Sequence, residues 1–121
     1  MANASASVAS QSVSIVRKAF SPQAVTIDTT IADSTTIDLR FAAGGVIKCT
    51  SIASVTFTWY ACDTDNGTFL PIYFGGAAVV TTVPGGTNCF VEIPDACWAY
   101  PYVRILPNAD DAETVTVILK S

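Results

Sequence analysis

The stretch that decides the fold is Val55-Thr56-Phe57-Thr58-Trp59-Tyr60-Ala61-Cys62. In an extended chain Val55, Phe57, Trp59 and Ala61 share one face, and the four residues between and after them share the other. This period of two residues is typical of a half-buried β-strand. The next five residues, Asp63-Thr64-Asp65-Asn66-Gly67, contain Asn-Gly, which suits the positive φ angles of a hairpin turn. They predict a partner strand over Thr68–Tyr73, in which Pro71 indicates an edge or a bulge.

The same alternation recurs on both sides of this stretch, with turn signals such as Gly44-Gly45, Gly75-Gly76 and Pro84-Gly85-Gly86 between the segments. The only helical segment expected is a short turn between Pro94 and Pro101. The pattern predicts an all-β fold, a two-sheet antiparallel β-sandwich that is either jelly-roll or immunoglobulin-like, with a strand order that this sequence does not reveal. The other expected strands cover Val25–Asp28, Ile37–Phe41, Val46–Thr50, Ala77–Val83, Cys89–Ile93, Tyr102–Leu106 and Thr114–Leu119.

The N-terminal part differs in composition, so we divide the chain into an extended N-terminal arm, residues 1–20, and a β-sandwich domain, residues 21–121. Residues 1–14 are rich in alanine and serine and poor in large apolar groups. Such a segment buries too little surface to offset the conformational entropy lost on ordering. We expect a neighbouring subunit to hold it, through its apolar residues Val8, Val13, Ile15 and Val16. The alternative is that the arm folds back onto its own domain.

Composition favours a protein partner. Half of the residues are hydrophobic and 13% are charged, against about 25% charged in an average soluble protein. Some apolar surface is therefore expected to meet another chain, although a surface of Thr, Ser and Asn is the competing interpretation. The net charge is −4 without a basic patch, so no nucleic-acid partner is expected. No apolar run approaches the length of a membrane span, and no signal peptide is apparent, so folding in a cytosol is predicted.

The sequence offers little catalytic chemistry. The chain contains no histidine, which excludes Ser-His-Asp and Cys-His nucleophile systems. Cys49, Cys62, Cys89 and Cys97 lack the close pairing of a zinc knuckle, and free, buried thiols are expected for them. We therefore expect no enzyme activity, no metal, no cofactor and no small-molecule ligand.

Aromatic residues provide the candidate binding surface. Tyr60, Trp98 and Tyr100 are the candidates for exposed rings. If residues 98–102 are extended, alternate rings lie on one side, as in a carbohydrate-binding platform. Core packing of Trp59 and Trp98 is the competing interpretation, and exposed aromatic residues are also enriched at protein interfaces.

Several segments resemble a pattern in small virion-associated proteins of tailed bacteriophages. In words, the pattern is a strand, a G-T-F-x-P hairpin, an x-P-x-A corner, a strand with Tyr and Arg, and a closing strand that ends in Lys. It runs from Val55 to the C-terminus. The segments that carry it are Phe57-Thr58-Trp59-Tyr60, Gly67-Thr68-Phe69-Leu70-Pro71-Ile72-Tyr73, Ile93-Pro94-Asp95-Ala96-Cys97-Trp98, Tyr102-Val103-Arg104-Ile105 and Val115-Thr116-Val117-Ile118-Leu119-Lys120.

The resemblance implies a capsid cement or decoration protein, a β-sandwich on the outer shell that braces the major capsid protein. The expected partners are then the major capsid protein and copies of this chain, and the expected location is the capsid surface of a virion made in the host cytoplasm. Such a family has no active-site residues to carry over. A carbohydrate-binding or host-attachment module, and a tail or neck component, remain the alternative hypotheses.

Overall fold

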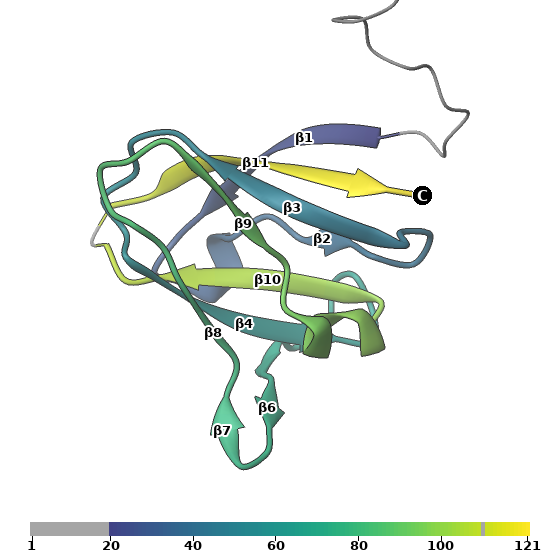
Figure 1. Ribbon diagram of the computed structural model, residues 1–121. Coiled ribbons are helices and arrows are strands. Elements are labelled where there is room, and N and C mark those ends of the chain that lie inside the picture. Colours follow the sequence, from purple (N-terminus) through teal and green to yellow (C-terminus); the bar gives the residue numbers. More distant parts are fainter. Residues whose placement is uncertain (1–19, 110) are drawn as a thin grey trace, which may run out of the picture.

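The computed structural model describes residues 20–109 and 111–121. Their strands form an all-β sandwich of antiparallel sheets (Figure 1), so the predicted fold class is confirmed. The predicted arm lies outside the described residues except for Phe20, which begins the first strand. The elements are β1 (Phe20–Ile27), η1 (Ile31–Asp33), β2 (Ile37–Asp38), β3 (Gly44–Cys49), β4 (Thr56–Cys62), β5 (Leu70–Pro71), β6 (Tyr73–Phe74), β7 (Ala77–Ala78), β8 (Val80–Thr82), β9 (Cys89–Glu92), η2 (Asp95–Ala99), β10 (Tyr102–Pro107) and β11 (Glu113–Lys120).

The strand pairing is nested. One sheet has the order β1-β11-β3-β9, and the other has the order β2-β10-β4-β5, with β8 also on β4. β1 therefore pairs with β11, β2 with β10, β3 with β9, and β4 with β8. This is the topology of one long hairpin rolled into two sheets, which is a jelly roll rather than an immunoglobulin-like sandwich.

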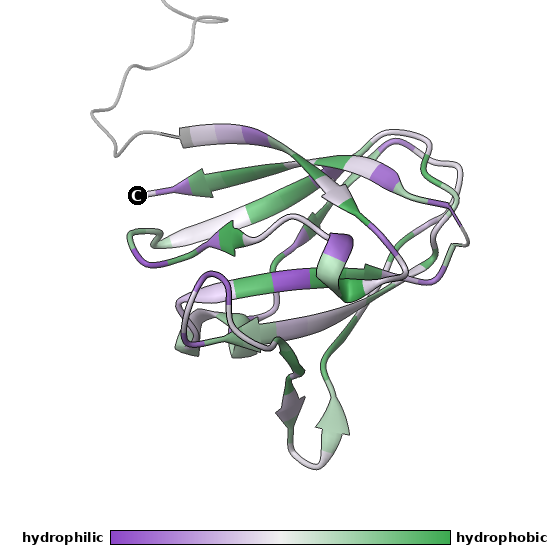
Figure 2. Cartoon of the chain, turned by 180° about the vertical axis from the view of Figure 1, so that it is seen from behind, coloured by the Kyte–Doolittle hydropathy of each residue, from purple (hydrophilic) through white to green (hydrophobic). Residues whose placement is uncertain are grey.

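The core lies between the two sheets, and the alternation predicted it along β4. Val55, expected on the same buried face, instead precedes β4 and is 45% exposed. Phe57, Trp59 and Ala61 of β4 are buried, while Thr56, Thr58 and Tyr60 between them are only half-buried. The same alternation of hydrophobic and hydrophilic residues is visible along β10 in Figure 2. Val103, Ile105, Val115 and Val117 complete this buried layer from β10 and β11.

One turn differs from its prediction. Asn66-Gly67 was expected to adopt positive φ, but the glycines with positive φ are Gly75, Gly76 and Gly86. Gly67 is required for a different reason, since a Cβ there would lie 2.5 Å from Thr64 Oγ1 and 2.6 Å from Cys62 Sγ. The loop is thus packed closely against the end of β4, and its partner β5 starts only at Leu70.

Candidate functional site

A hairpin projects from the edge of the five-stranded sheet, away from the rest of the sandwich (Figure 1). It forms because β5 and β8 share one edge of β4: β5 pairs at Tyr60 and Ala61, and β8 pairs at Thr56 to Thr58. The chain leaves this edge after β5 and returns to it before β8. The two predicted strands, Thr68–Tyr73 and Ala77–Val83, are therefore each divided into a sheet part and a projecting part.

The base of the hairpin is fixed at Trp59. The Ile72 backbone N–H donates to the Trp59 carbonyl at 3.0 Å, and the Trp59 N–H donates to the Val79 carbonyl at 3.1 Å. The Val79 N–H also donates to the Ile72 carbonyl at 2.9 Å, which closes the base. The Trp59 indole is fully buried and donates from Nε1 to Thr81 Oγ1 at 2.9 Å. The hairpin is thus anchored to one of the largest core residues.

The tip of the hairpin is a two-residue turn. Gly75 and Gly76 have φ angles of +63° and +82°, which glycine adopts without steric cost and which match the right-handed twist of the flanking strands. β6 and β7 pair on either side of this turn. Tyr73 is 63% exposed and Phe74 is 75% exposed. We call residues Tyr73–Ala78 the projecting hairpin.

The projecting hairpin forms one wall of a groove of about 560 Å³. The opposite wall is the η2 turn, in which the Cys97 N–H donates to the Pro94 carbonyl and the Tyr100 N–H donates to the Cys97 carbonyl. Cys97 is buried and anchors η2 to the core. We call this space the hairpin groove, and its lining residues are Ile72, Tyr73, Phe74, Val79, Pro94, Asp95, Ala96, Ala99 and Tyr100.

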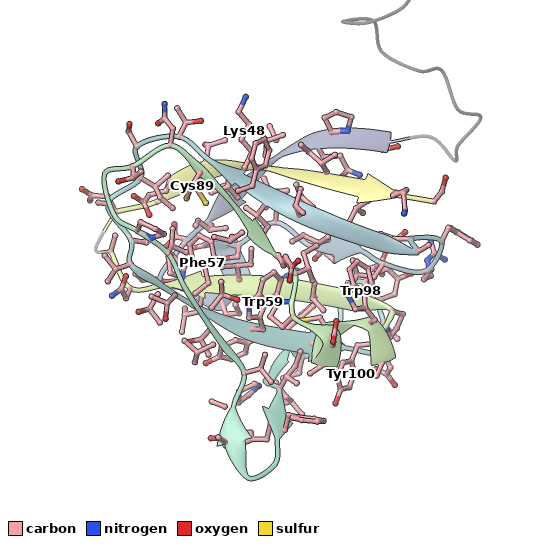
Figure 3. The ribbon with its side chains drawn as sticks, viewed as in Figure 1. Lys48, Phe57, Trp59, Cys89, Trp98 and Tyr100 are labelled. Carbon is pink, nitrogen blue, oxygen red and sulfur yellow. The ribbon has the colours of Figure 1, made fainter. Side chains whose placement is uncertain are left out.

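A second hollow of about 420 Å³ adjoins the hairpin groove, because Ile72 and Tyr100 line both spaces. Its other walls come from the end of β4 and from β5, and they include Asp63 and the exposed Leu70. Together the two spaces surround Tyr100, which Figure 3 labels on the same side of the molecule as the projecting hairpin. The apolar surface therefore extends from the hairpin to the edge of the sheet.

The chemistry of the hairpin groove is suited to binding. Among its described lining residues the only charged side chain is Asp95, and none is a lysine or an arginine. General acid–base hydrolysis by paired carboxylates requires two such groups facing each other. Three aromatic rings and several aliphatic groups can instead bury an apolar partner, with Asp95 available to a cation.

The candidate aromatic residues do not form one platform. Tyr100 is 38% exposed and lines the groove. Tyr60 and Trp98 are only half-buried rather than exposed, and Trp98 packs against the core. The reason is that Trp98 and Ala99 lie in the η2 turn, whereas the expected platform required an extended segment. Val8, Val13, Ile15 and Val16 of the predicted arm lie outside the described residues.

Sequence reasoning missed Tyr73 and Phe74 as site residues. Both fall within or beside a segment with the pattern of a strand, so they were expected to be part of a sheet. The available signal was their position directly before Gly75-Gly76, since a two-glycine turn places its neighbours at a hairpin tip.

Residues 20–109 and 111–121 also contain titratable and metal-ligating groups outside the hairpin groove. In the part of the chain that the structure describes, no three His, Cys, Asp or Glu side chains come together in a way that could hold a metal ion. Likewise, none of the helical segments described there has the length and apolar character of a membrane span. Burial raises the pKa of Cys97 to about 12, and burial with the adjacent Cys89 raises that of Cys49 to about 11, so neither thiol is a ready nucleophile.

Comparisons with known proteins give no relative from which a function could be inferred. Neither the family models, nor the curated proteins, nor the solved structures searched contain a significant match to this chain.

Proposed function

We propose that this chain is a non-enzymatic structural protein of a tailed-bacteriophage particle, a capsid cement or decoration protein that bridges major capsid protein subunits. In this proposal it is made in the host cytoplasm, lies on the capsid surface, and binds the major capsid protein and copies of itself. The observation that carries the proposal is the projecting hairpin, which presents Tyr73 and Phe74 to solvent beside an apolar groove.

Solvent exposure of these rings has an energetic cost that a partner would remove. Burying one large apolar side chain contributes about 1.5–3 kcal/mol. Aromatic residues, phenylalanine and tyrosine among them, are also enriched at protein interfaces, and tyrosine is among the residues that most often dominate their binding energy. A protein partner that buries Tyr73 and Phe74 would therefore explain why these rings project into solvent instead of packing in the core.

Fold and sequence support the same setting. Jelly rolls are common in viral capsid proteins and in lectins, although a fold by itself does not determine function. The resemblance to virion-associated proteins includes the segment Gly67–Tyr73, which leads directly into the projecting hairpin. On a capsid, modest contacts of each copy would be strengthened by multivalency.

The test uses purified particles of the phage that encodes the chain. We expect immunogold labelling on the capsid surface. We also expect particles that lack the chain to bind the added full-length protein, and Phe74→Glu to weaken this binding about tenfold or more. Phe41→Glu is the matched control, since Phe41 is 79% exposed in a different loop. The proposal fails if purified particles lack the chain or if Phe74→Glu binds as the wild type does.

The same labelling separates the capsid from other positions in the particle. A tail or neck component would use the same sandwich and the same apolar hairpin. Gold at the neck or the tail, with none on the head, would assign the chain there and overturn the cement role.

A carbohydrate-binding or host-attachment module is the second candidate, favoured by the aromatic lining of the hairpin groove. Sugar rings stack on planar side chains, and Tyr73, Phe74 and Tyr100 all line this groove beside Asp95. Under this hypothesis a glycan array gives specific hits that Tyr100→Ala abolishes. An array without hits, together with capsid binding, excludes it.

A further inference from the structure

We infer that the hairpin groove receives residues 13–18 of a second copy of this chain, so that copies join head to tail. The inference rests on the proposed function, because it names which part of the assembly occupies this groove. It also assigns a role to the arm residues Val13 and Ile15.

The lining of the groove specifies the chemistry of its occupant. Aromatic and aliphatic side chains make up most of both walls, and Asp95 supplies the single negative charge. A fitting segment therefore has apolar side chains followed closely by a cationic one. An occupant with carboxylates would place like charges together in an apolar space, which costs free energy.

This chain contains such a segment. Residues 13–18 read Val-Ser-Ile-Val-Arg-Lys. When such a segment is extended, Val13, Ile15 and Arg17 share one face, because side chains alternate along a strand. Val13 and Ile15 can then contact the aromatic wall while Arg17 reaches Asp95.

The charges of the two parts are also complementary. The whole chain has a net charge of −4, and residues 1–19 contribute +2 through Arg17 and Lys18, which leaves −6 for the remainder. Opposite net charges favour encounter between the arm of one copy and the domain of another. They also disfavour direct contact between two acidic domains without an arm between them.

The start of β1 lies away from the projecting hairpin (Figure 1), which favours an occupant from another copy. β1 starts at Phe20 in the four-stranded sheet, while the projecting hairpin extends from the far side of the other sheet (Figure 1). Arg17 is three residues before Phe20, so the backbone between their Cα atoms spans about 10 Å at most. Asp95 follows β9, which β11 and β3 separate from β1 in the four-stranded sheet, so three strand spacings of about 4.8 Å each lie between them. We therefore assign the groove to the arm of another copy, since an arm of the same chain would have to cross the whole four-stranded sheet before it entered the groove.

A contact between an arm and a distant groove is heterologous, so each copy has one donor and one acceptor. Such contacts close into a ring or continue as an open chain of copies. They also allow two different defects to complement each other. A copy with a defective groove still has a working arm, and a copy with a defective arm still has a working groove.

The experiment uses this complementation with full-length protein. The groove variant is Phe74→Glu, the arm variant is Arg17→Glu combined with Lys18→Glu, and Phe41→Glu is the control, each checked for folding by circular dichroism. Sedimentation is measured over a concentration series. We expect the wild type and the control to self-associate. Each defective variant alone should self-associate with an affinity lower by about tenfold or more. An equimolar mixture of the two variants should form a dimer and nothing larger.

Three results would overturn the inference: a monomeric wild type at all concentrations, a mixture that stays monomeric while the wild type assembles, or association that the Phe74→Glu substitution leaves unchanged. The proposed function can fail separately. If the variants complement each other but the chain is absent from particles, the inference stands and the cement role falls. If the wild type is monomeric yet binds capsids through Phe74, the cement role stands and the inference about the arm fails.

Discussion

At the scale of single residues, the buried thiols illustrate how the core controls chemistry. Cys97 and Cys49 are fully buried, and their pKa values are raised from 9.0 to about 12 and about 11. Burial disfavours the thiolate because the charged form loses its hydration. The four cysteines were predicted to be free and mostly buried, and the structure has no disulfide among them.

These pKa values predict that stability falls in alkaline solution. A thiol whose folded pKa is raised keeps its proton in the folded state when the unfolded state has already lost it, so rising pH favours unfolding. The contribution of the Cys97 thiol to the free energy of unfolding is fully present below about pH 9 and is lost progressively as the pH rises to about 12. Urea unfolding across this range measures it. Cys97→Ala should show a shallower decline, and an identical decline in this variant would contradict the assignment.

At the scale of elements, the predicted strands match the structure where the local residue pattern determines their bounds. They differ where hydrogen bonding to distant strands determines them. Alternation located β4 and β10 to within a residue or two, and Pro94 to Pro101 contains the expected helical turn. The divisions at Ile72 and Val79 could not be predicted, because both segments have the pattern of a continuous strand. They depend on hydrogen bonds to Trp59, which is distant in sequence. The hairpin groove was unpredictable for the same reason.

The turn of the projecting hairpin gives a prediction at this scale. An alanine at Gly76 must adopt a φ near +82°, which costs an L-residue about 1–2 kcal/mol. Gly44→Ala is the matched control, because a Cβ at either position meets no atom within 4 Å and Gly44 lacks a positive φ. We expect urea unfolding to show a loss of about 1–2 kcal/mol for Gly76→Ala and a change within about 0.5 kcal/mol for the control. Equal effects would exclude backbone strain as the cause.

At the scale of the whole molecule, the projecting hairpin lies outside the core of the sandwich. The core residues lie between the two sheets, and the projecting hairpin contributes none of the buried ones. The alternation and the turn signals correctly predicted an all-β sandwich, but they could not distinguish a jelly roll from an immunoglobulin-like fold. That choice depends on which distant strands pair, as β1 does with β11, and alternation within each strand carries no information about its neighbours.

This separation predicts that the hairpin can be removed. The Val79 N–H donates to the Ile72 carbonyl at 2.9 Å, and the same bond would close a two-residue turn if two residues replaced the six between them. Replacing Tyr73–Ala78 with Asn-Gly should therefore preserve the sandwich, with unfolding free energy within about 1 kcal/mol of wild type, and should abolish self-association in sedimentation. An unfolded product would show that the hairpin is part of the folding unit.

The nested pairing also has a consequence for how the protein is made. A ribosome produces β1 early and β11 late, yet these two strands pair along their whole length, and β11 also separates β1 from β3. The four-stranded sheet therefore cannot form until β11 has been synthesised, and such long-range closure is slow. A chain that stops before Glu113 leaves two strands without their common neighbour. Such truncated products are expected to be degraded by the cell rather than to enter an assembly as faulty subunits.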